Sequence, residues 1–374
     1  MDELSQIADF GLGWLDASGS FAGIVLSTRV RIARNLQGHA FGPRARVNDR
    51  EAVLRQIRLT AEKAPTLEGA TIAELPELGG RARRILLERR LASRELLGEP
   101  NTGPARATAV VLAARDPVSI MVNEEDHLRL QGLASGLQLK EVWHLVDRLD
   151  EELGQELPYA YHHEFGFLTS CPTNVGTGVR ASVLMHLPGL VLTKEINKVL
   201  QGLSQVGLTF RGLYGEGSEV VGNFFQVSNQ TTLGRTEEDL VEHLETTVRQ
   251  VIQFESQARQ VLLRDAGQVT EDKIWRALGL LTYARSLSFE ELMNLLSGVR
   301  LGVGLKLLPN LRVYTLNKLM IFTQAAHLEQ AAGRDLPPAE SDVHRATYVR
   351  RILAREGAVK PNDESEAPEG PPES

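Results

Sequence analysis

Hydrophobic and polar positions follow two different periods along the chain. Alternation or short apolar runs predict strands at 24–35, 107–113, 118–122, 183–187, 206–211 and 223–229. Apolar residues at helical spacing predict amphipathic helices over 48–64, 139–153 and 190–204. The runs 107–113 and 118–122 are separated by an Arg-Asp-Pro sequence, which predicts a β-hairpin. Up to about residue 230, the chain is therefore predicted to mix strands with helices.

From Thr236 to residue 355 the pattern is helical throughout. Thr236-Glu-Glu-Asp239 predicts a capped start for a long helix. Breaks are expected near Gly267, 302–304, Pro309 and 337–338. The last stretch, 356–374, is acidic, rich in proline and nearly free of apolar residues, so we expect it to be disordered.

Composition and charge argue against several classes of protein. Hydrophobic residues make up 42% and charged residues 24% of the 374 positions, as in ordinary globular proteins. The net charge of −7 argues against nonspecific binding of nucleic acid. No apolar run is long enough for a transmembrane helix, and the acidic N-terminus does not resemble a signal peptide. The single cysteine, Cys171, excludes an internal disulfide, and we expect a cytoplasmic location.

The segment 166–188 has the strongest chemical pattern. Cys171 and the following proline begin a polar loop of threonine, asparagine and glycine residues, which ends at Arg180. Glycines let backbone N–H groups approach an anion, and a neighbouring arginine can bind phosphate through paired hydrogen bonds. Walker and dinucleotide-binding patterns are absent from this loop. The spacing fits a phosphate site, and a tight hairpin loop is the alternative.

Two further clusters carry candidate chemistry. Alternation places Arg29 and Arg31 on one face of the predicted strand 24–35, where their charges repel unless an anion lies between them. A solvated edge strand is the alternative. Three consecutive carboxylates at 124–126 follow another strand, which favours binding of a cation or metal, and an acidic surface turn is the alternative. The adjacent pair at 162–163 has no spaced third ligand, so we predict no metal site there.

Four blocks together resemble the ATP:guanidino phosphotransferases, the phosphagen kinase family. In family order they are Ser27-Thr-Arg-Val-Arg31, Asn123-Glu-Glu-Asp-His127 with Arg129, Cys171-Pro-Thr-Asn-Val-Gly-Thr-Gly-Val-Arg180 and Arg211-Gly-Leu-Tyr-Gly-Glu216. The resemblance implies an α+β fold of the phosphagen kinase/glutamine synthetase-like type, with an antiparallel β-sheet flanked by helices. It also implies transfer of the γ-phosphate of ATP to a guanidinium nitrogen.

The resemblance implies roles for individual residues. Glu125 and Glu216 would hold the substrate guanidinium, with Glu216 as general base, and Cys171 would contact that guanidinium as a thiolate. The positions that would surround ATP are Ser27, Thr28, Arg29, Arg31, Arg129, Arg180 and Arg211. The basic stretch 81–94 is predicted to be a solvated face, from which one or two arginines could reach the nucleotide. Mg²⁺ is implied by the use of ATP, and no side chain is nominated as its ligand.

The order of the parts indicates one branch of this family. The animal phosphagen kinases carry a helical domain before the first arginine strand, and Ser27 lies too near the N-terminus for one here. A helical part follows instead, as in the bacterial protein arginine kinases. We therefore expect a catalytic domain at 1–257, a helical dimerisation or regulatory domain at 258–355 and a disordered tail at 356–374.

The activity that this resemblance implies is phosphorylation of arginine side chains exposed on proteins. It further implies a homodimer, a heat-shock repressor among the substrates, an activator protein and delivery of marked proteins to a Clp chaperone-protease. Direct binding of nucleic acid or membrane is not implied. Two alternatives stay open: a kinase of a free guanidino metabolite such as arginine, and a catalytically idle scaffold that binds partner proteins.

One position departs from the relatives that sense phosphoarginine. Their helical domain carries Arg-Asp-x-x-Arg-Ala, whereas this chain has Ser341-Asp-Val-His-Arg-Ala346. Asp342 and Arg345 match, and the first arginine is replaced by Ser341. We expect weak phosphoarginine binding here, because a charge-assisted contact is lost. An amphipathic packing helix is the alternative.

Overall fold

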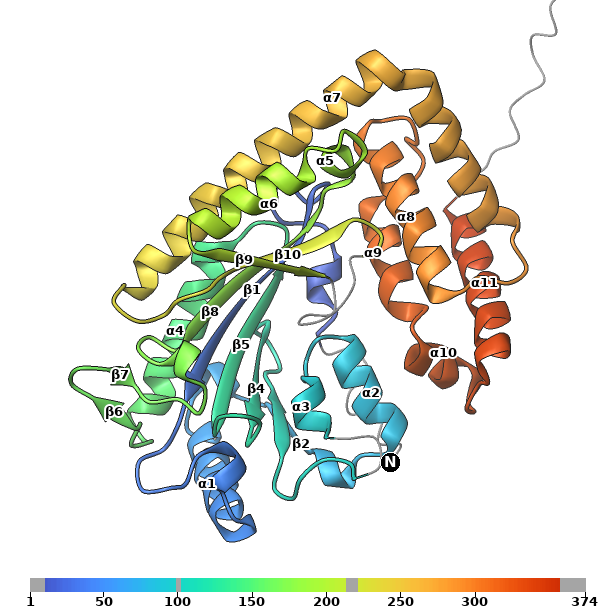
Figure 1. The fold of residues 1–374 in the computed structure, drawn as a ribbon. Coiled ribbons are helices and arrows are strands. Elements are labelled where there is room, and N and C mark those ends of the chain that lie inside the picture. The colour runs from blue at the N-terminus through green and yellow to red at the C-terminus, as the bar shows by residue number, and fades with distance from the viewer. Residues whose placement is uncertain (1–10, 99–101, 213–220, 357–374) are drawn as a thin grey trace, which may run out of the picture.

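The computed structural model describes residues 11–98, 102–212 and 221–356, and an eight-stranded sheet lies at its centre (Figure 1). The strands are β1 (Val25–Arg34), β2 (Thr71–Glu74), β3 (Ala109–Leu112), β4 (Val118–Val122), β5 (Leu128–Ser135), β8 (Val179–His186), β9 (Leu208–Gly212) and β10 (Phe224–Asn229). Their order is β2-β3-β4-β5-β1-β8-β10-β9, and each pairing among the described residues is antiparallel. A separate ribbon of β6 (Tyr161–His162) and β7 (Gly166–Phe167) lies beside the sheet. The predicted antiparallel sheet flanked by helices is confirmed, as is the hairpin of β3 and β4.

One face of the sheet packs against three long helices. These are α1 (Val47–Ala61), α4 (Leu139–Gly154) and the first part of α7 (Glu237–Tyr283), which share the largest hydrophobic core with the sheet. Val30 and Ile32 of β1 are fully buried in that core. Because side chains alternate along a strand, Arg29 and Arg31 point to the opposite face.

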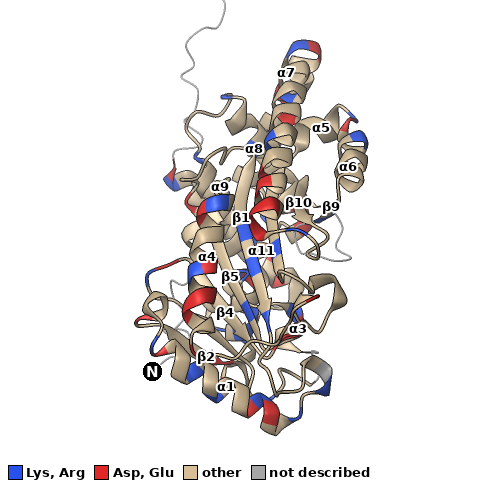
Figure 2. Cartoon of the chain, turned by 90° about the vertical axis from the view of Figure 1, so that its left-hand side faces the viewer, with Lys and Arg blue, Asp and Glu red and all other residues tan. Residues whose placement is uncertain are grey.

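The opposite face is covered at its two ends by different helices. At one end lie α2 (Gly80–Glu88) and α3 (Arg94–Leu97), which pack on β2, β3 and β4. At the other end lies the helical part, formed by the end of α7 with α8 (Phe289–Gly304), α9 (Val313–Phe322), α10 (Ala325–Ala332) and α11 (Pro338–Arg355). Its core includes Leu26, Leu184 and Phe224 of the sheet. Figure 2 shows basic positions gathered on the central strands, near β1 and β5.

Two of the three helices predicted before residue 230 are present as single elements: 48–64 corresponds to α1, which ends three residues earlier at Ala61, and 139–153 corresponds to α4. The expected helix 190–204 is wrong as a single element, because the chain forms α5 (Pro188–Leu192) and then α6 (Ile196–Gln205). Lys194 between them has φ +62°, a left-handed conformation that ends the first helix. The predicted cap of α7 is confirmed, since the Thr236 side chain accepts a hydrogen bond from the Asp239 N–H.

Helix α7 belongs to both hydrophobic cores. Its residues up to Ala258 lie in the core of the sheet, and those from Ile274 onward lie in the core of the helical part. Ala266, next to the predicted break at Gly267, has non-helical backbone angles. The boundary expected at 257/258 falls inside α7 and stays a prediction, and residues 357–374 of the expected tail lie outside the described residues. Within the described part of the chain, no helix is both long and apolar enough to cross a membrane.

Candidate active site

Strand register brings predicted arginines from three adjacent strands onto one face of the sheet. Arg31 on β1 lies directly opposite Arg180 on β8. Arg29 precedes Arg31 by two residues and therefore shares its face. Ala33, two residues after Arg31, lies opposite Arg129 on β5. The three strands thus place four of the predicted ATP-binding arginines side by side.

The fifth predicted arginine lies on the same face, near the far edge of the sheet. Arg211 on β9 lies opposite Gln226 on β10. The Gln226 side chain accepts a hydrogen bond from Arg29 Nη2 at 3.3 Å. We call the surface formed by Arg29, Arg31, Arg129, Arg180 and Arg211 the arginine face.

Because the arginine face is buried, positive charges on it are unfavourable unless an anion is bound there. Burial, with Arg129 and Arg180, lowers the pKa of Arg31 to about 9. Burial and the charges of Arg31 and Arg90 also hold the pKa of Arg29 well below its ordinary value. The Nε atoms of Arg29 and Arg31 are buried without a hydrogen-bond partner among the described residues. A polyphosphate fits this face, because it supplies both negative charge and hydrogen-bond acceptors.

The predicted serine and threonine of β1 differ in what they contact. The Ser27 hydroxyl accepts a hydrogen bond from Arg90 at 3.5 Å, so it lies at the arginine face. The Thr28 hydroxyl donates to the Gly136 carbonyl at 2.7 Å and accepts from the Gln138 N–H at 3.1 Å. Thr28 therefore stabilises the fold from the other side of the strand.

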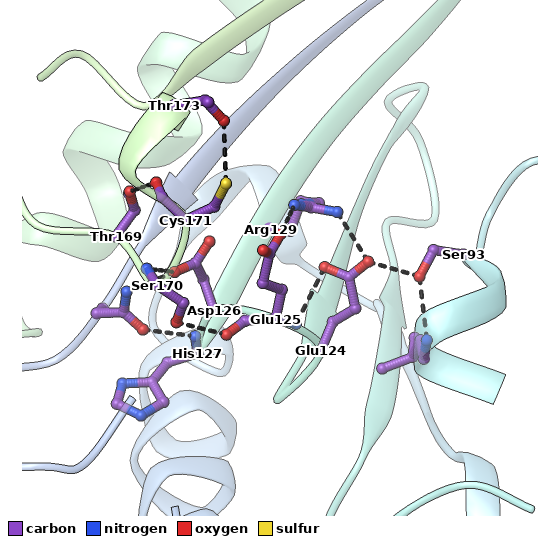
Figure 3. A network of polar contacts seen from close by, with 12 residues as sticks. Ser93, Glu124, Glu125, Asp126, His127, Arg129, Thr169, Ser170, Cys171 and Thr173 are labelled. Atoms are coloured by element: carbon purple, nitrogen blue, oxygen red, sulfur yellow. Dashed lines mark hydrogen bonds and ion pairs between the residues drawn. The ribbon is translucent and has the colours of Figure 1, made fainter. Parts of the chain in front are cut away.

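Carboxylates adjoin the arginine face at Arg129 (Figure 3). Its Nη1 donates to Glu124 Oε1 at 2.7 Å, and its Nη2 donates to Glu125 Oε2 at 3.0 Å. The Glu124 side chain is completely buried and also accepts from the Ser93 hydroxyl at 2.6 Å. The Glu125 side chain is 39% exposed, so it is open to a ligand. Burial raises the pKa of Glu125 against the lowering effect of Arg129, and Asp126 and Glu124 raise it further.

Asp126 joins the carboxylate loop to the loop of Cys171. Its Oδ1 accepts from the Asn35 side chain and from the Ser170 N–H, both at 2.7 Å. The Ser170 hydroxyl donates to the Glu125 carbonyl at 2.7 Å. Figure 3 shows these contacts holding Glu125 and Cys171 on neighbouring loops. Of the three carboxylates, Glu124 and Asp126 are used within the protein, and Glu125 is the one available to a substrate.

Cys171 is a partly exposed free thiol at the start of a loop that hydrogen bonds hold in place. Its Sγ lies 3.0 Å from the Thr173 hydroxyl. The Thr232 hydroxyl donates to the carbonyls of Thr173 and Val175 at 3.1 and 2.7 Å. Gly176 has φ +109°, and a Cβ there would lie 2.8 Å from the Thr232 carbonyl oxygen. This close approach requires glycine.

Arg34 binds the loop that begins at Cys171, and no sequence motif had indicated it as a site residue. It is 2% exposed, and its Nε and Nη2 donate to Asp150 at 3.0 and 2.6 Å. Its Nη1 donates to the Thr177 carbonyl at 2.8 Å, and its guanidinium lies 3.5 Å from the centre of the Phe167 ring. One signal was available: Arg34 is out of phase with Arg29 and Arg31, and an arginine on the core side of a strand requires a buried partner.

Among the arginines of the basic stretch, Arg90 reaches the site. Its charge lowers the pKa of both Arg29 and Arg31, although burial is the largest cause for each. Two others, Arg81 and Arg84, form ion pairs with Glu329 of α10. The expectation that one or two of these arginines could reach the nucleotide therefore applies first to Arg90.

Two of the residues predicted from the sequence are not part of the site that the structure describes. Glu216, the predicted general base, lies outside the described residues, so its place relative to Glu125 stays a prediction. Arg345 is buried in α11, where it donates to the carbonyls of Thr323 and Leu287 at 3.0 and 2.8 Å and forms an ion pair with Asp342. These bonds support the packing-helix alternative, and the phosphoarginine role stays a prediction.

No group of three or more metal-ligating side chains is present among the described residues. His162 and His163 lie in the β6–β7 ribbon, where the His162 ring stacks on Phe165 and lies tilted against the His163 ring.

Comparison with known families gives two matches that together span most of the chain. The family described as ATP:guanido phosphotransferase, C-terminal catalytic domain, matches residues 53–258. The family described as Protein-arginine kinase McsB C-terminal domain matches residues 267–366.

Relatives of similar length align with this chain over nearly all of their own sequences. A protein-arginine kinase from Pelotomaculum thermopropionicum is 46% identical over 344 residues, which are 91% of this chain and 95% of the relative. A protein-arginine kinase from Symbiobacterium thermophilum is 45% identical over 344 residues, which are 91% of this chain and 96% of the relative.

Two solved structures share the fold over more than half of this chain. The duplicated taurocyamine kinase from Schistosoma mansoni, with bound transition state analog components, is 27% identical with a TM-score of 0.55. That match covers 62% of this chain and 33% of the duplicated one. Lombricine kinase is 22% identical with a TM-score of 0.56, covering 70% of this chain and 76% of that one, and shows the common fold alone.

Proposed function

Because the chain belongs to the ATP:guanido phosphotransferase family, in the branch of the protein-arginine kinases, we propose that it transfers the γ-phosphate of ATP to arginine side chains of proteins. One observation carries this proposal most directly. The arginine face lies beside Glu125, so a site for polyphosphate adjoins a carboxylate that can bind a guanidinium.

The transfer breaks the bond between the γ-phosphorus and the bridging oxygen of ATP and forms a bond from phosphorus to a guanidinium nitrogen. One guanidinium proton must leave, and ADP is the second product. Free arginine keeps its proton at neutral pH, so the nucleophile needs a nearby proton acceptor. We assign this role to Glu216, which the sequence motif nominates.

Other side chains would orient the reactants. The arginine face would stabilise charge on the phosphoryl oxygens, since phosphoryl transfer depends mainly on positioning and electrostatics. Glu125 would bind the planar guanidinium, and the Cys171 thiol would contact it from the neighbouring loop. Mg²⁺ would accompany ATP and neutralise part of its charge, held by phosphate oxygens and water.

Protein substrates are proposed because the relatives are protein-arginine kinases. The family resemblance alone supports a homodimer, an activator protein, a heat-shock repressor as substrate and delivery to a Clp chaperone-protease. We place the protein in the cytoplasm, where a thiol such as Cys171 stays reduced.

In the deciding experiment, the wild-type protein is incubated with labelled ATP and one of two acceptors. One acceptor is free arginine, and the other is an unfolded protein that contains arginine. We expect label in protein that is lost in acid and kept in mild base, as a phosphorus–nitrogen bond to arginine requires. Label on free arginine alone would establish the metabolite kinase instead. No transfer to either acceptor would support the idle scaffold.

A further inference from the structure

The turn after α2 has an unusual backbone. The N–H of Arg90 donates to the Leu87 carbonyl at 2.9 Å, and the N–H of Leu91 donates to the Leu86 carbonyl at 2.8 Å. This pair of bonds is a Schellman ending, in which glycine usually occupies the left-handed position. Here Arg90 occupies it, with φ +66°. A strained residue of this kind persists only where its surroundings hold it in place.

The turn contacts the arginine face and the carboxylates on one side. Arg90 Nη1 lies 3.5 Å from the Ser27 hydroxyl, and its charge acts on Arg29 and Arg31. Three residues further on, the Ser93 hydroxyl donates to Glu124, which in turn binds Arg129. A shift of this turn would therefore move groups at both parts of the candidate site.

On its other side, the turn is bound by α10 of the helical part. Glu88 accepts hydrogen bonds from the N–H groups of Ala326 and His327 at 2.8 and 3.2 Å, and lies 2.6 Å from His327 Nδ1. Arg89 Nε donates to His327 Nε2 at 3.2 Å. Figure 1 shows α2 and α10 next to each other, and both Arg89 and His327 are buried.

These contacts fix the protonation form of the ring. Arginine is always a donor, so His327 Nε2 must be the acceptor, and the proton must lie on Nδ1, from which it is donated to Glu88. A single neutral histidine therefore binds the two consecutive residues that precede Arg90.

We propose that His327 is a positioning residue for the nucleotide site: from α10 it holds Glu88 and Arg89, so that Arg90 keeps its left-handed backbone and directs its guanidinium to the phosphates of ATP. This inference rests on the proposed function, because it assumes that the arginine face binds a nucleotide. It assigns part of the nucleotide affinity to the helical part, far from residue 90 in the sequence.

The interface of α2 and α10 offers a matched control. Glu329, two residues after His327, pairs instead with Arg84 and Arg81, which precede the turn in α2. Glu329→Gln weakens the same interface without touching residues 88–90. A role of His327 in packing alone would be matched by this variant.

The test measures the dissociation constant of a fluorescent ATP analogue with Mg²⁺, together with KM for ATP and kcat. His327→Phe keeps the ring shape but removes both side-chain bonds, and we expect a dissociation constant about tenfold higher, the usual effect of losing a charge-assisted contact. His327→Gln, which can still offer an acceptor to Arg89, is expected to stay within about threefold of wild type. Glu329→Gln is expected to leave nucleotide affinity unchanged.

A double variant decides whether His327 acts through Arg90. Arg90→Gln alone should weaken nucleotide binding, and adding His327→Phe to it should change little, because coupled residues are not additive. A full His327 effect in the Arg90→Gln background overturns the inference, as does an equal loss in Glu329→Gln. If His327→Phe does not fold, judged by circular dichroism, Glu88→Gln takes its place, and unchanged affinity there overturns the inference.

The comparisons of the His327, Glu329 and Arg90 variants require only that the protein binds nucleotide. The wild-type assay with protein and free arginine judges the proposed function separately, so failure of one does not imply failure of the other.

Discussion

Arg31 on β1 and Arg180 on β8 lie directly opposite each other in an antiparallel pair, on a face where burial lowers the pKa of Arg31 to about 9. Like charges in such a cross-strand pair destabilise a sheet. A polyphosphate bound between them converts the repulsion into shared attraction. The stability of the sheet should therefore depend on the ligand.

Replacing Arg31 should separate stability from binding. We expect Arg31→Gln to raise the free energy of unfolding of the ligand-free protein by about 0.5–1 kcal/mol, because one repelling charge is removed. The variant should lose the stabilisation by MgATP, which reaches ~2.7 kcal/mol in the wild type at a hundredfold excess over Kd. Urea unfolding with and without MgATP measures both effects, with the exposed Arg55→Gln as control. A less stable variant that still gains from MgATP would contradict this account.

Glu125 should set the acid limit of activity. Its carboxylate must be ionised to bind a guanidinium, and burial raises its pKa above the ordinary glutamate value of about 4.3. Activity is therefore present above the raised pKa and is lost as the pH falls through it, at a higher pH than for an exposed glutamate. The pH profile of kcat/KM measures this, and Glu125→Gln should be slower and lack that acid limb. An identical acid limb in the variant would assign it to another group.

Glu216→Gln should abolish most transfer while leaving nucleotide binding intact. Loss of a general base typically lowers the rate by ~10²–10⁴. Turnover and binding of a fluorescent ATP analogue, measured on the same preparation, separate the two effects. Near-normal turnover would move the base elsewhere, and Glu125 would be the next candidate.

Cys171 can be tested by alkylation without ambiguity, because it is the single cysteine of the chain. We expect alkylation to lower activity, and MgATP with an arginine substrate to protect the thiol, since the substrate guanidinium would cover it. Cys171→Ser should be less active and unlabelled. Mass spectrometry follows the labelling, and full activity after complete alkylation would place the thiol away from the guanidinium.

Arg345 should prove structural. Arg345→Leu leaves the carbonyls of Thr323 and Leu287 without their buried donor, and we expect a loss of ~2–4 kcal/mol in the free energy of unfolding. The exposed Arg351→Leu on the same helix is the control. Calorimetry of the wild type with free phosphoarginine should show weak binding, using Glu216→Gln to prevent turnover. Tight phosphoarginine binding that Arg345→Leu abolishes without loss of stability would reverse this assignment.

Local sequence patterns predicted the parts of the site that lie on regular elements. Alternation put Arg29 and Arg31 on one face, and the motifs identified Arg129, Arg180 and Arg211. The structure adds that strand register brings these residues together, which no single strand can indicate.

Contacts between distant residues were not predictable in this way. Arg34 binds Asp150 across 116 positions, and Glu88 binds His327 across 239. Neither pair has a period or motif that links its members. The division of 190–204 into two helices was missed for a different reason: Lys194 adopts a left-handed conformation that glycine or asparagine usually signals.

The shared helix α7 has a consequence for how the chain unfolds. Leu26, Leu184 and Phe224 of the sheet are buried by the helical part, although they belong to the same sheet as the arginine face. A fragment ending at residue 257 would cut α7 and leave these three apolar side chains in water, which favours aggregation. The two halves should therefore melt in one cooperative transition, and a catalytic half exchanged between relatives would need its own helical half to remain folded.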